Sequence, residues 1–122
     1  MSVSELTYEP RARYPGLEGR VAVVTGTSHG IGCGIAEVLG LQGMQVVLTA
    51  RSEERGVAFR DLLRGRGVEC AWVTADLADR DDARRVLDAA RNEFGRLDVL
   101  VNNAGIMGRQ GPFQDVTPEL YH

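Results

Sequence analysis

The sequence predicts an α/β fold in which helices cover both faces of a parallel sheet, giving three layers. Two observations predict it. Four short apolar runs, often β-branched, alternate with three longer stretches of helical periodicity between residues 20 and 101, and a glycine follows each of those stretches. This alternation is typical of parallel sheets, because a parallel neighbour can be reached only through a long crossover that is usually a helix.

The first strand and helix are expected at residues 20–26 and 31–42. RVAVVTG is a short β-branched run that ends in glycine, as buried strands often do. The helix has one apolar face, and Gly43 stands just past its last turn, where a terminating glycine is common. That face comprises Ile31, Ile35, Val38 and Leu39.

The second strand and helix follow directly. QVVLTA, residues 45–50, is again β-branched and apolar. Ser52 can cap the next helix, and two acids follow it in the first turn, near the positive end of the helix dipole. Gly65 and Gly67 are expected to end this helix.

The clearest helix lies between the last two strands, which are expected at 68–76 and 97–101. Asp79 is expected to cap it and Gly95 to end it. Its apolar positions follow three-and-four spacing and are Ala83, Val86, Leu87, Ala90 and Phe94.

Right-handed crossovers would arrange the four strands in the order 3-2-1-4 and open a ligand crevice above strands one and four. We assign this domain to residues 19–122. Residues 1–18 are charged, contain two prolines and show no periodicity. We interpret them as an extension whose order depends on contacts outside it.

Composition argues against several kinds of partner. A net charge of -3 and the absence of a basic run give no support to nucleic-acid binding. No apolar stretch approaches the roughly 20 residues of a membrane-spanning helix, and the first residues lack the features of a secretion signal. We therefore expect a cytoplasmic protein with no membrane partner. Cys33 and Cys70 have no paired spacing and are expected to be buried free thiols.

The loop TGTSHGIG, residues 25–32, joins strand one to helix one, where parallel-sheet proteins hold phosphate against helix N-terminal amides. Gly26 would let the backbone turn off the strand. Gly30 and Gly32 would remove side chains where a pyrophosphate or a neighbouring strand comes close. The loop indicates a Rossmann-type dinucleotide site, although its spacing is not GxGxxG. A glycine-rich turn without a ligand is the alternative.

Arg51 follows strand two, where an NAD site would carry an acid for the ribose 2′-hydroxyl. An acid would repel a 2′-phosphate, whereas an arginine can bind it through paired charge-assisted hydrogen bonds. We therefore predict NADP(H) in preference to NAD(H). The alternative is an ordinary surface arginine. His29 could add a weak contact or be a solvated loop residue.

Together with LVNNAG (100–105), the glycine loop resembles the classical short-chain dehydrogenases/reductases. The two motifs occur in the order and on the elements that the family uses. The resemblance extends from about Leu17 to the end of the chain and includes ADL at 75–77. The stretch VVLTARSEERG (46–56) further resembles the NADPH-dependent carbonyl reductases of this family.

The resemblance implies a set of cofactor-binding residues along these motifs. The loop would hold the pyrophosphate, Arg51 with Ser52 the 2′-phosphate, and the segment after Asn102 the ribose. Asp76 would bind the adenine amino group, and Asn102 would bridge neighbouring strand ends. Alternatives are a turn or capping role for Asp76 and an ordinary turn for the asparagines. The full set is Gly26, Thr27, Ser28, His29, Gly30, Ile31, Gly32, Arg51, Ser52, Asp76, Leu77, Asn103, Ala104 and Gly105.

The family transfers hydride between the cofactor and a carbonyl or alcohol, with a serine and a tyrosine whose pKa is lowered by a lysine four residues later. This chain contains no lysine, so that pair cannot occur in it and no catalytic residue is predicted. Its last residues, TPELYH (117–122), have the features of a helix start. The sequence thus resembles the first half of such an enzyme, truncated to about four strands.

An apolar strand edge should stay uncovered in a four-stranded fragment, so we expect self-association or a complementing second half. Two functions remain open. One is the NADP(H)-binding part of an oxidoreductase that acts on a small carbonyl or alcohol. The other is a non-catalytic nucleotide-binding module or a subunit of a split protein. A degenerate fragment that binds nothing is a third interpretation.

Overall fold

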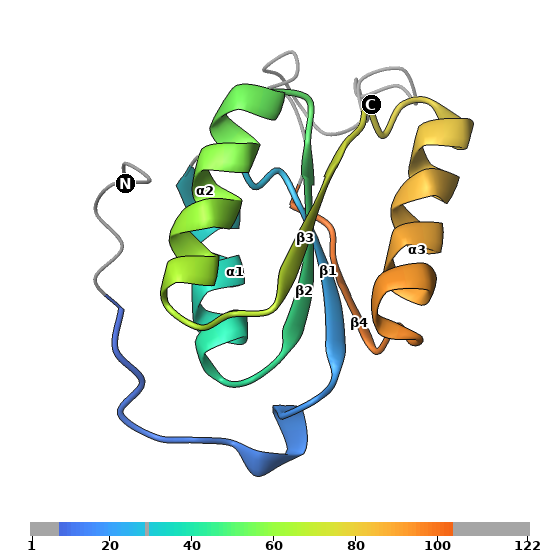
Figure 1. Cartoon of the computed structure of the whole chain (residues 1–122). Coiled ribbons are helices and arrows are strands. Elements are labelled where there is room, and N and C mark those ends of the chain that lie inside the picture. Colours follow the sequence, from blue (N-terminus) through green and yellow to red (C-terminus); the bar gives the residue numbers. More distant parts are fainter. Residues whose placement is uncertain (1–7, 29, 104–122) are drawn as a thin grey trace, which may run out of the picture.

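The computed structural model describes residues 8–28 and 30–103 as a parallel sheet of four strands between helices (Figure 1). The strand order is β3-β2-β1-β4, which confirms the predicted order and the doubly wound α/β class. None of the helices in this part of the chain is long and apolar enough to cross a membrane. The elements are η2 (Pro15–Leu17, a 3-10 turn), β1 (Val21–Thr25), α1 (Gly30–Leu41), β2 (Gln45–Ala50), α2 (Glu53–Gly65), β3 (Cys70–Thr74), α3 (Arg80–Phe94) and β4 (Val99–Val101).

Strand β1 lies at the centre of the sheet, with Val23 opposite both Val47 of β2 and Leu100 of β4. All of its residues are buried. Successive side chains point to opposite faces, so Ala22 joins the core under α1 and α2 whereas Val21 joins the core under α3. Burial on both faces explains why this strand is an unbroken apolar run in the sequence.

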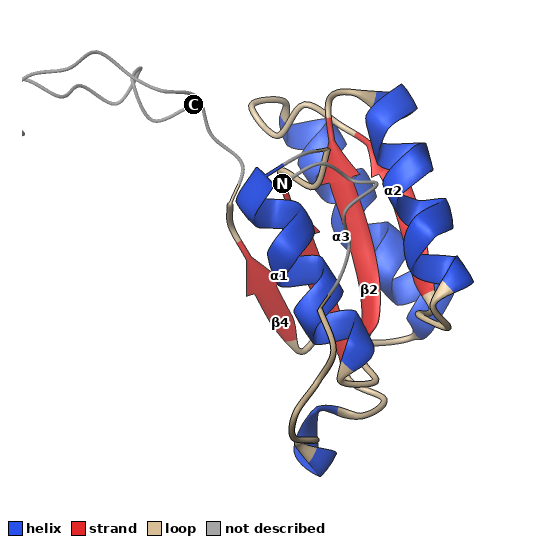
Figure 2. Cartoon of the chain, turned by 90° about the vertical axis from the view of Figure 1, so that its left-hand side faces the viewer, coloured by secondary structure: helices blue, strands red, loops and turns tan. Residues whose placement is uncertain are grey.

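Different helices cover the two faces of the sheet (Figures 1 and 2). Helices α1 and α2 pack on one face through Ala36 and Phe59, and α3 packs on the other through Val86 and Ala90. Each helix begins shortly after the carboxyl end of a strand. Because the strands are parallel, the N-termini of all three helices lie toward the same edge of the sheet.

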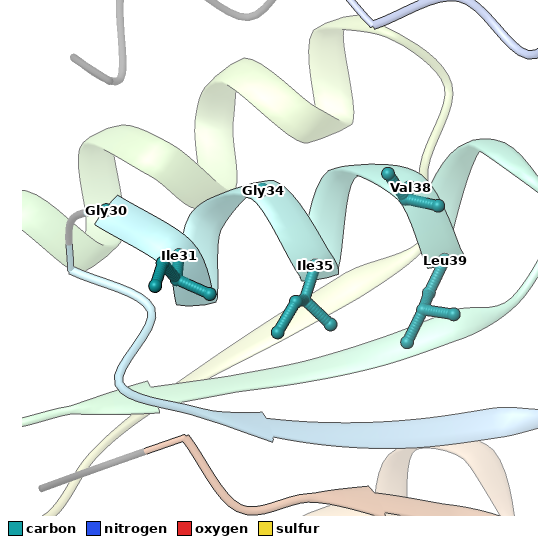
Figure 3. Close-up of a pocket in the computed structure, with 6 residues that line it drawn as sticks. All are labelled: Gly30, Ile31, Gly34, Ile35, Val38 and Leu39. Carbon is teal, nitrogen blue, oxygen red and sulfur yellow. The ribbon is translucent and has the colours of Figure 1, made fainter.

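The apolar face predicted for α1 packs on the core only in part: Ile35 and Leu39 lie against it half-buried, whereas Ile31 and Val38 are exposed. The fully buried positions of the helix are taken mostly by small residues, among them Cys33, Ala36 and Gly40. A Cβ at position 40 would lie 2.6 Å from Val68, so the close approach of the helix requires small side chains. The predicted face also lines a surface hollow, in which Ile31 is 75% exposed. Figure 3 shows its lining residues, Gly30, Ile31, Gly34, Ile35, Val38 and Leu39.

The predicted helix ends are confirmed with one exception. The Asp79 carboxylate accepts hydrogen bonds from the amides of Asp81 and Asp82, at 2.8 and 3.3 Å. Gly95 ends α3 with φ of 80°, in the left-handed region that favours glycine. Ser52 stands at the N-cap position of α2, but its hydroxyl makes no capping bond, so the prediction that its side chain caps the helix is wrong.

Residues 8–18 contain no regular element except η2. They run beside the C-terminal ends of α1 and α2 and then below the amino edge of the sheet (Figures 1 and 2). Contacts from outside the segment hold it, as its composition suggests. They come from Glu37 and Gln42 at α1 and from Arg66 at the end of α2.

Gly56 of α2 faces Trp72 of β3 without room for a side chain, because a Cβ there would overlap the six-membered ring. We expect Gly56→Ala to lower the free energy of unfolding by about 1–3 kcal/mol, the usual effect of overpacking. Gly65→Ala is the matched control on the same helix, with nothing within 4 Å of the new Cβ, and should be neutral or slightly stabilising. Denaturant unfolding measures both, and equal effects would contradict this packing.

Asp98 ties the start of β4 to β1 at the amino edge of the sheet. Its carboxylate accepts hydrogen bonds from the Val21 amide at 2.9 Å and from Arg96 Nε at 2.8 Å. The hydrogen bond from Arg96, followed by the one from the Val21 amide, lowers the pKa of Asp98 below its ordinary value. The fold therefore favours the charged carboxylate.

This lowered pKa predicts a contribution to stability that acid removes. The contribution is fully present above the pKa of an unfolded aspartate, about 3.9, and is lost as the pH falls through the lower folded value. Asp98→Asn should reduce the melting temperature at pH 7 and flatten its decline below about pH 4. Asp88→Asn, at an exposed acid of α3, is the control and should do neither. If the melting temperature of Asp98→Asn falls with pH in parallel with that of the wild type, Asp98 does not make this contribution to stability.

Candidate functional site

The loop between β1 and α1 lies at the carboxyl edge of the sheet, where the sequence predicts the site. Gly26 has φ of 70° and Gly30 has φ of 64°, both in the left-handed region that glycine adopts without strain. These two turns lead the chain from β1 into α1. The first amides of α1 have no partner within the helix and, with the helix dipole, form an anion-binding end.

Gly32 is buried where α1 meets the ends of two strands. A Cβ at this position would overlap the carbonyl oxygen of Gly26 and lie 2.8 Å from Nδ2 of Asn103. The missing side chain lets the helix start, the glycine turn and residue 103 come together. This cradle of backbone fits a pyrophosphate, which needs main-chain donors with no side chain between them and the ligand.

Thr27 anchors this loop to β2. Its amide and its hydroxyl both donate to the carbonyl oxygen of Thr49, at 3.2 and 3.3 Å, and its own carbonyl accepts from the Cys33 thiol at 3.4 Å. The residue is fully buried. The structure therefore gives Thr27 an anchoring role, with no free donor for the predicted cofactor contact. Ser28, beside it, is 8% exposed.

Thr25 joins the two sequence motifs across β1 and β4. Its hydroxyl donates to the carbonyl of Val101 at 3.3 Å and accepts from the amide of Asn103 at 2.8 Å. Sequence reasoning missed this role, although a hydroxyl at the end of an apolar strand was a usable signal. The side chain of Asn102 is exposed and has no hydrogen bond to the residues that the structure describes. Among the described residues, the bridge predicted for Asn102 is made by Thr25.

Arg51 is exposed just after β2, at the start of α2. Its guanidinium has no hydrogen bond or ion pair within the described part of the chain. The Ser52 hydroxyl beside it is not used for capping. This helix start offers a guanidinium, a hydroxyl and first-turn amides, which suit a phosphate monoester. Glu53 and Glu54 in the same turn oppose an anion, so Arg51 has to supply the counter-charge.

Asp76 lies in an exposed turn after β3. Its Oδ1 accepts from the amide of Ala78 at 3.0 Å, and its own amide donates to Oδ2 of Asp82 at 2.9 Å. The hydrogen bond from the Asp76 amide, followed by one from Arg85, lowers the pKa of Asp82. Sequence reasoning missed Asp82, which holds this turn. The turn role considered for Asp76 is observed, and its adenine contact stays a prediction. Leu77 packs against the core under α3.

The remaining predicted residues divide into two groups. His29, Ala104 and Gly105 lie outside the described residues, as does the helix start expected at 117–122. Ile31 turns its side chain to solvent but lies in the first turn of α1, where its backbone amide was the predicted contact.

Both cysteines are buried free thiols, as predicted. Burial raises the pKa of Cys33 to about 11 and also raises the pKa of Cys70, so both stay protonated near neutral pH. Within residues 8–28 and 30–103, no three His, Cys, Asp or Glu side chains are grouped so that they could hold a metal ion.

Comparisons with known proteins agree with this geometry. The family model for short chain dehydrogenases matches residues 20–122. An uncharacterized oxidoreductase of Thermotoga maritima is 41% identical over 98 residues, which are 80% of this chain and 38% of the relative.

Two solved structures have similar folds and contain a cofactor. A metagenomic short-chain oxidoreductase in complex with NADP has a TM-score of 0.71 and 41% identity, over 84% of this chain and 46% of the other. L-Sorbose reductase from Gluconobacter frateurii, complexed with NADPH and L-sorbose, has a TM-score of 0.70 and 39% identity. The match covers 84% of this chain and 39% of the reductase chain. The chain spans less than half the length of each of these three proteins.

Proposed function

Because this chain belongs to the short-chain dehydrogenase/reductase family, we propose that it is the NADP(H)-binding part of an oxidoreductase that interconverts a small carbonyl compound and an alcohol. The observation that carries the choice of NADP(H) is the unpaired Arg51 at the start of α2, at the same edge of the sheet as the glycine loop. The NADP and NADPH in the two structural neighbours support it. Family membership alone supports only a dinucleotide.

The residues of this chain would bind and orient the cofactor. The first amides of α1 would hold the pyrophosphate, and Arg51 with Ser52 would hold the 2′-phosphate. Asn103, fixed by Thr25, would begin the wall along the ribose. When bound, NADP(H) supplies or accepts the hydride.

Carbonyl reduction also needs a positioned acid for the oxygen. A tyrosine becomes such an acid near neutral pH when a cation lowers its pKa, and this chain has no lysine for that purpose. We therefore place the acid in a second half of a complete enzyme. The same absence fits the second candidate equally, a nucleotide-binding module or a subunit of a split protein without chemistry of its own.

Exposed apolar surface supports a protein partner. Leu97 and Leu100 are 42% and 56% exposed, and in the described sheet β4 pairs only with β1. The hollow on α1 is open on the other face of the sheet from Leu100 (Figure 3). We propose that a complementing second half or another copy of the chain covers the open edge of β4, and that the protein works in the cytoplasm.

Calorimetric titration of the 122-residue chain with NADPH and with NADH tests the proposal. We expect saturable binding of both dinucleotides, with NADPH the tighter ligand. No saturable heat up to millimolar concentration would contradict both candidate functions. Carbonyl reduction that appears only after a second half is added would identify the enzyme, and binding without such rescue would favour the module.

A further inference from the structure

An extended segment, residues 8–14, passes outside the C-terminal ends of α1 and α2 (Figures 1 and 2). Its main chain is attached at two points. At the first, the side-chain amide of Gln42, just after α1, makes two bonds. The Tyr14 amide donates to its Oε1 at 3.0 Å, and its Nε2 donates to the Ala12 carbonyl at 2.7 Å.

The second attachment joins the segment to both helices. The Tyr8 amide donates to Oε1 of Glu37 on α1 at 2.9 Å. Arg66, at the C-cap of α2, donates from Nη2 to the Tyr8 carbonyl at 2.7 Å and pairs with Glu9 Oε1 at 2.6 Å. Nη1 of Arg66 lies 4.0 Å from Oε1 of Glu37. Tyr8 and Glu9 of the segment therefore connect α1 to α2.

The side chains of Glu37 and Gln42 are buried, so little water is available to replace their bonds to the segment. Glu37 is 2% exposed and Gln42 is 3% exposed. A buried carboxylate is unfavourable unless it is paired and hydrogen-bonded, and within the described chain Glu37 Oε2 has no hydrogen bond. Arg66 and the Tyr8 amide are thus its compensation. A segment that served only to cover the helices would need apolar side chains beneath it, whereas these residues bind its main chain.

The segment acts at the ends of α1 and α2 that lie away from the proposed cofactor. At the opposite ends, α1 starts with the glycine loop and α2 starts beside Arg51. A short helix transmits a tilt from one end to the other, because backbone hydrogen bonds join each turn to the next. Resting on the proposed function, we propose that residues 8–14 are a brace that fixes α1 against α2 and so sets the spacing between the pyrophosphate and 2′-phosphate positions.

Two measurements on the full 122-residue chain test the brace. The first is hydrogen exchange at the Tyr8 and Tyr14 amides, which the brace bonds protect. The second is the ratio of the dissociation constants for NADH and NADPH. A merely structural role would weaken both dinucleotides equally and leave this ratio unchanged, because only NADPH spans both phosphate positions.

Gln42→Ala removes both bonds of the first attachment. We expect faster exchange at Tyr14 and a preference for NADPH reduced roughly three- to tenfold. Gln45→Ala is the matched control, because its side chain bonds Glu69 and no residue of the brace, and it should change neither. Arg66→Met removes the α2 part of the second attachment, namely the bond to the Tyr8 carbonyl and the pair with Glu9, and leaves only the bond between the Tyr8 amide and Glu37. We expect faster exchange at Tyr8 and a shift of the ratio in the same direction, and this variant decides the case if Gln42→Ala does not fold.

The other possible outcomes contradict the coupling, the brace or the proposed function, as follows. A folded Gln42→Ala chain that loses protection at Tyr14 but keeps the wild-type ratio rules out the coupling to the cofactor site. Wild-type exchange at Tyr14 in that variant rules out the brace itself. A wild-type chain that binds neither dinucleotide overturns the proposed function and the coupling together, whereas the exchange data still test the brace.

Discussion

Replacing Gly32 with alanine should remove most dinucleotide binding. The new Cβ would overlap the Gly26 carbonyl oxygen and crowd Nδ2 of Asn103, so the turn has to open or α1 has to move. Either change displaces the first amides of α1 from the pyrophosphate position. We expect the affinity for NADPH to fall roughly 100-fold, or about 2.8 kcal/mol, in a calorimetric titration.

The control for this variant is Gly40→Ala on the same helix. Its Cβ would lie 2.6 Å from Val68, far along α1 from the glycine loop. We expect it to lower the free energy of unfolding by about 1–3 kcal/mol and to leave the affinity for NADPH unchanged once the chain is folded. If the two variants weaken binding equally, the effect of Gly32→Ala comes from lost stability and the loop is not the phosphate site.

Arg51→Asp should reverse the preference between the two cofactors. The carboxylate would repel the 2′-phosphate, in a turn that already contains Glu53 and Glu54, and could accept a hydrogen bond from the ribose hydroxyl of NADH. We expect NADPH to bind roughly 100-fold more weakly, the size of a lost hydrogen bond between charged groups together with the new repulsion. NADH should bind as well as before or better.

Arg84→Asp separates this effect from net charge. Arg84 is exposed on α3, on the opposite face of the sheet from α2, and its replacement makes the same change in charge. Its ratio of NADPH to NADH affinity should match that of the wild type, with both dissociation constants measured at one fixed ionic strength because surface charge effects depend on salt. An unchanged ratio in Arg51→Asp would remove the structural basis for choosing NADP(H).

The fold was predictable because the strands of a doubly wound sheet are buried on both faces and appear as unbroken apolar runs. The packing of α1 was not. Periodicity marks Ile31 as part of the core face, but Ile31 is exposed, and the most deeply buried positions of the helix include Gly32, Ala36 and Gly40. A hydrophobicity pattern gives little weight to glycine and alanine, so it misplaces the centre of the buried face when close packing decides.

The candidate site was predictable where it depends on local backbone chemistry. Glycines with positive φ at positions 26 and 30 and an arginine after the second strand are visible in the sequence alone. Thr25 was missed because its partner, Asn103, stands 78 positions away. Glu37 was missed for the same reason, since its partners are Tyr8 and Arg66. Such pairs exist only once the topology has brought distant segments together.

Amide chemical-shift mapping during a titration with NADPH tests the central claim most directly. The claim is that a dinucleotide rests on the first turn of α1 with its 2′-phosphate at Arg51. We expect the largest shifts at the amides of residues 26–32 and at Arg51 and Ser52, with the shifts at 51 and 52 absent when NADH replaces NADPH. Saturable shifts confined to another surface, such as the outer side of α3, would contradict it.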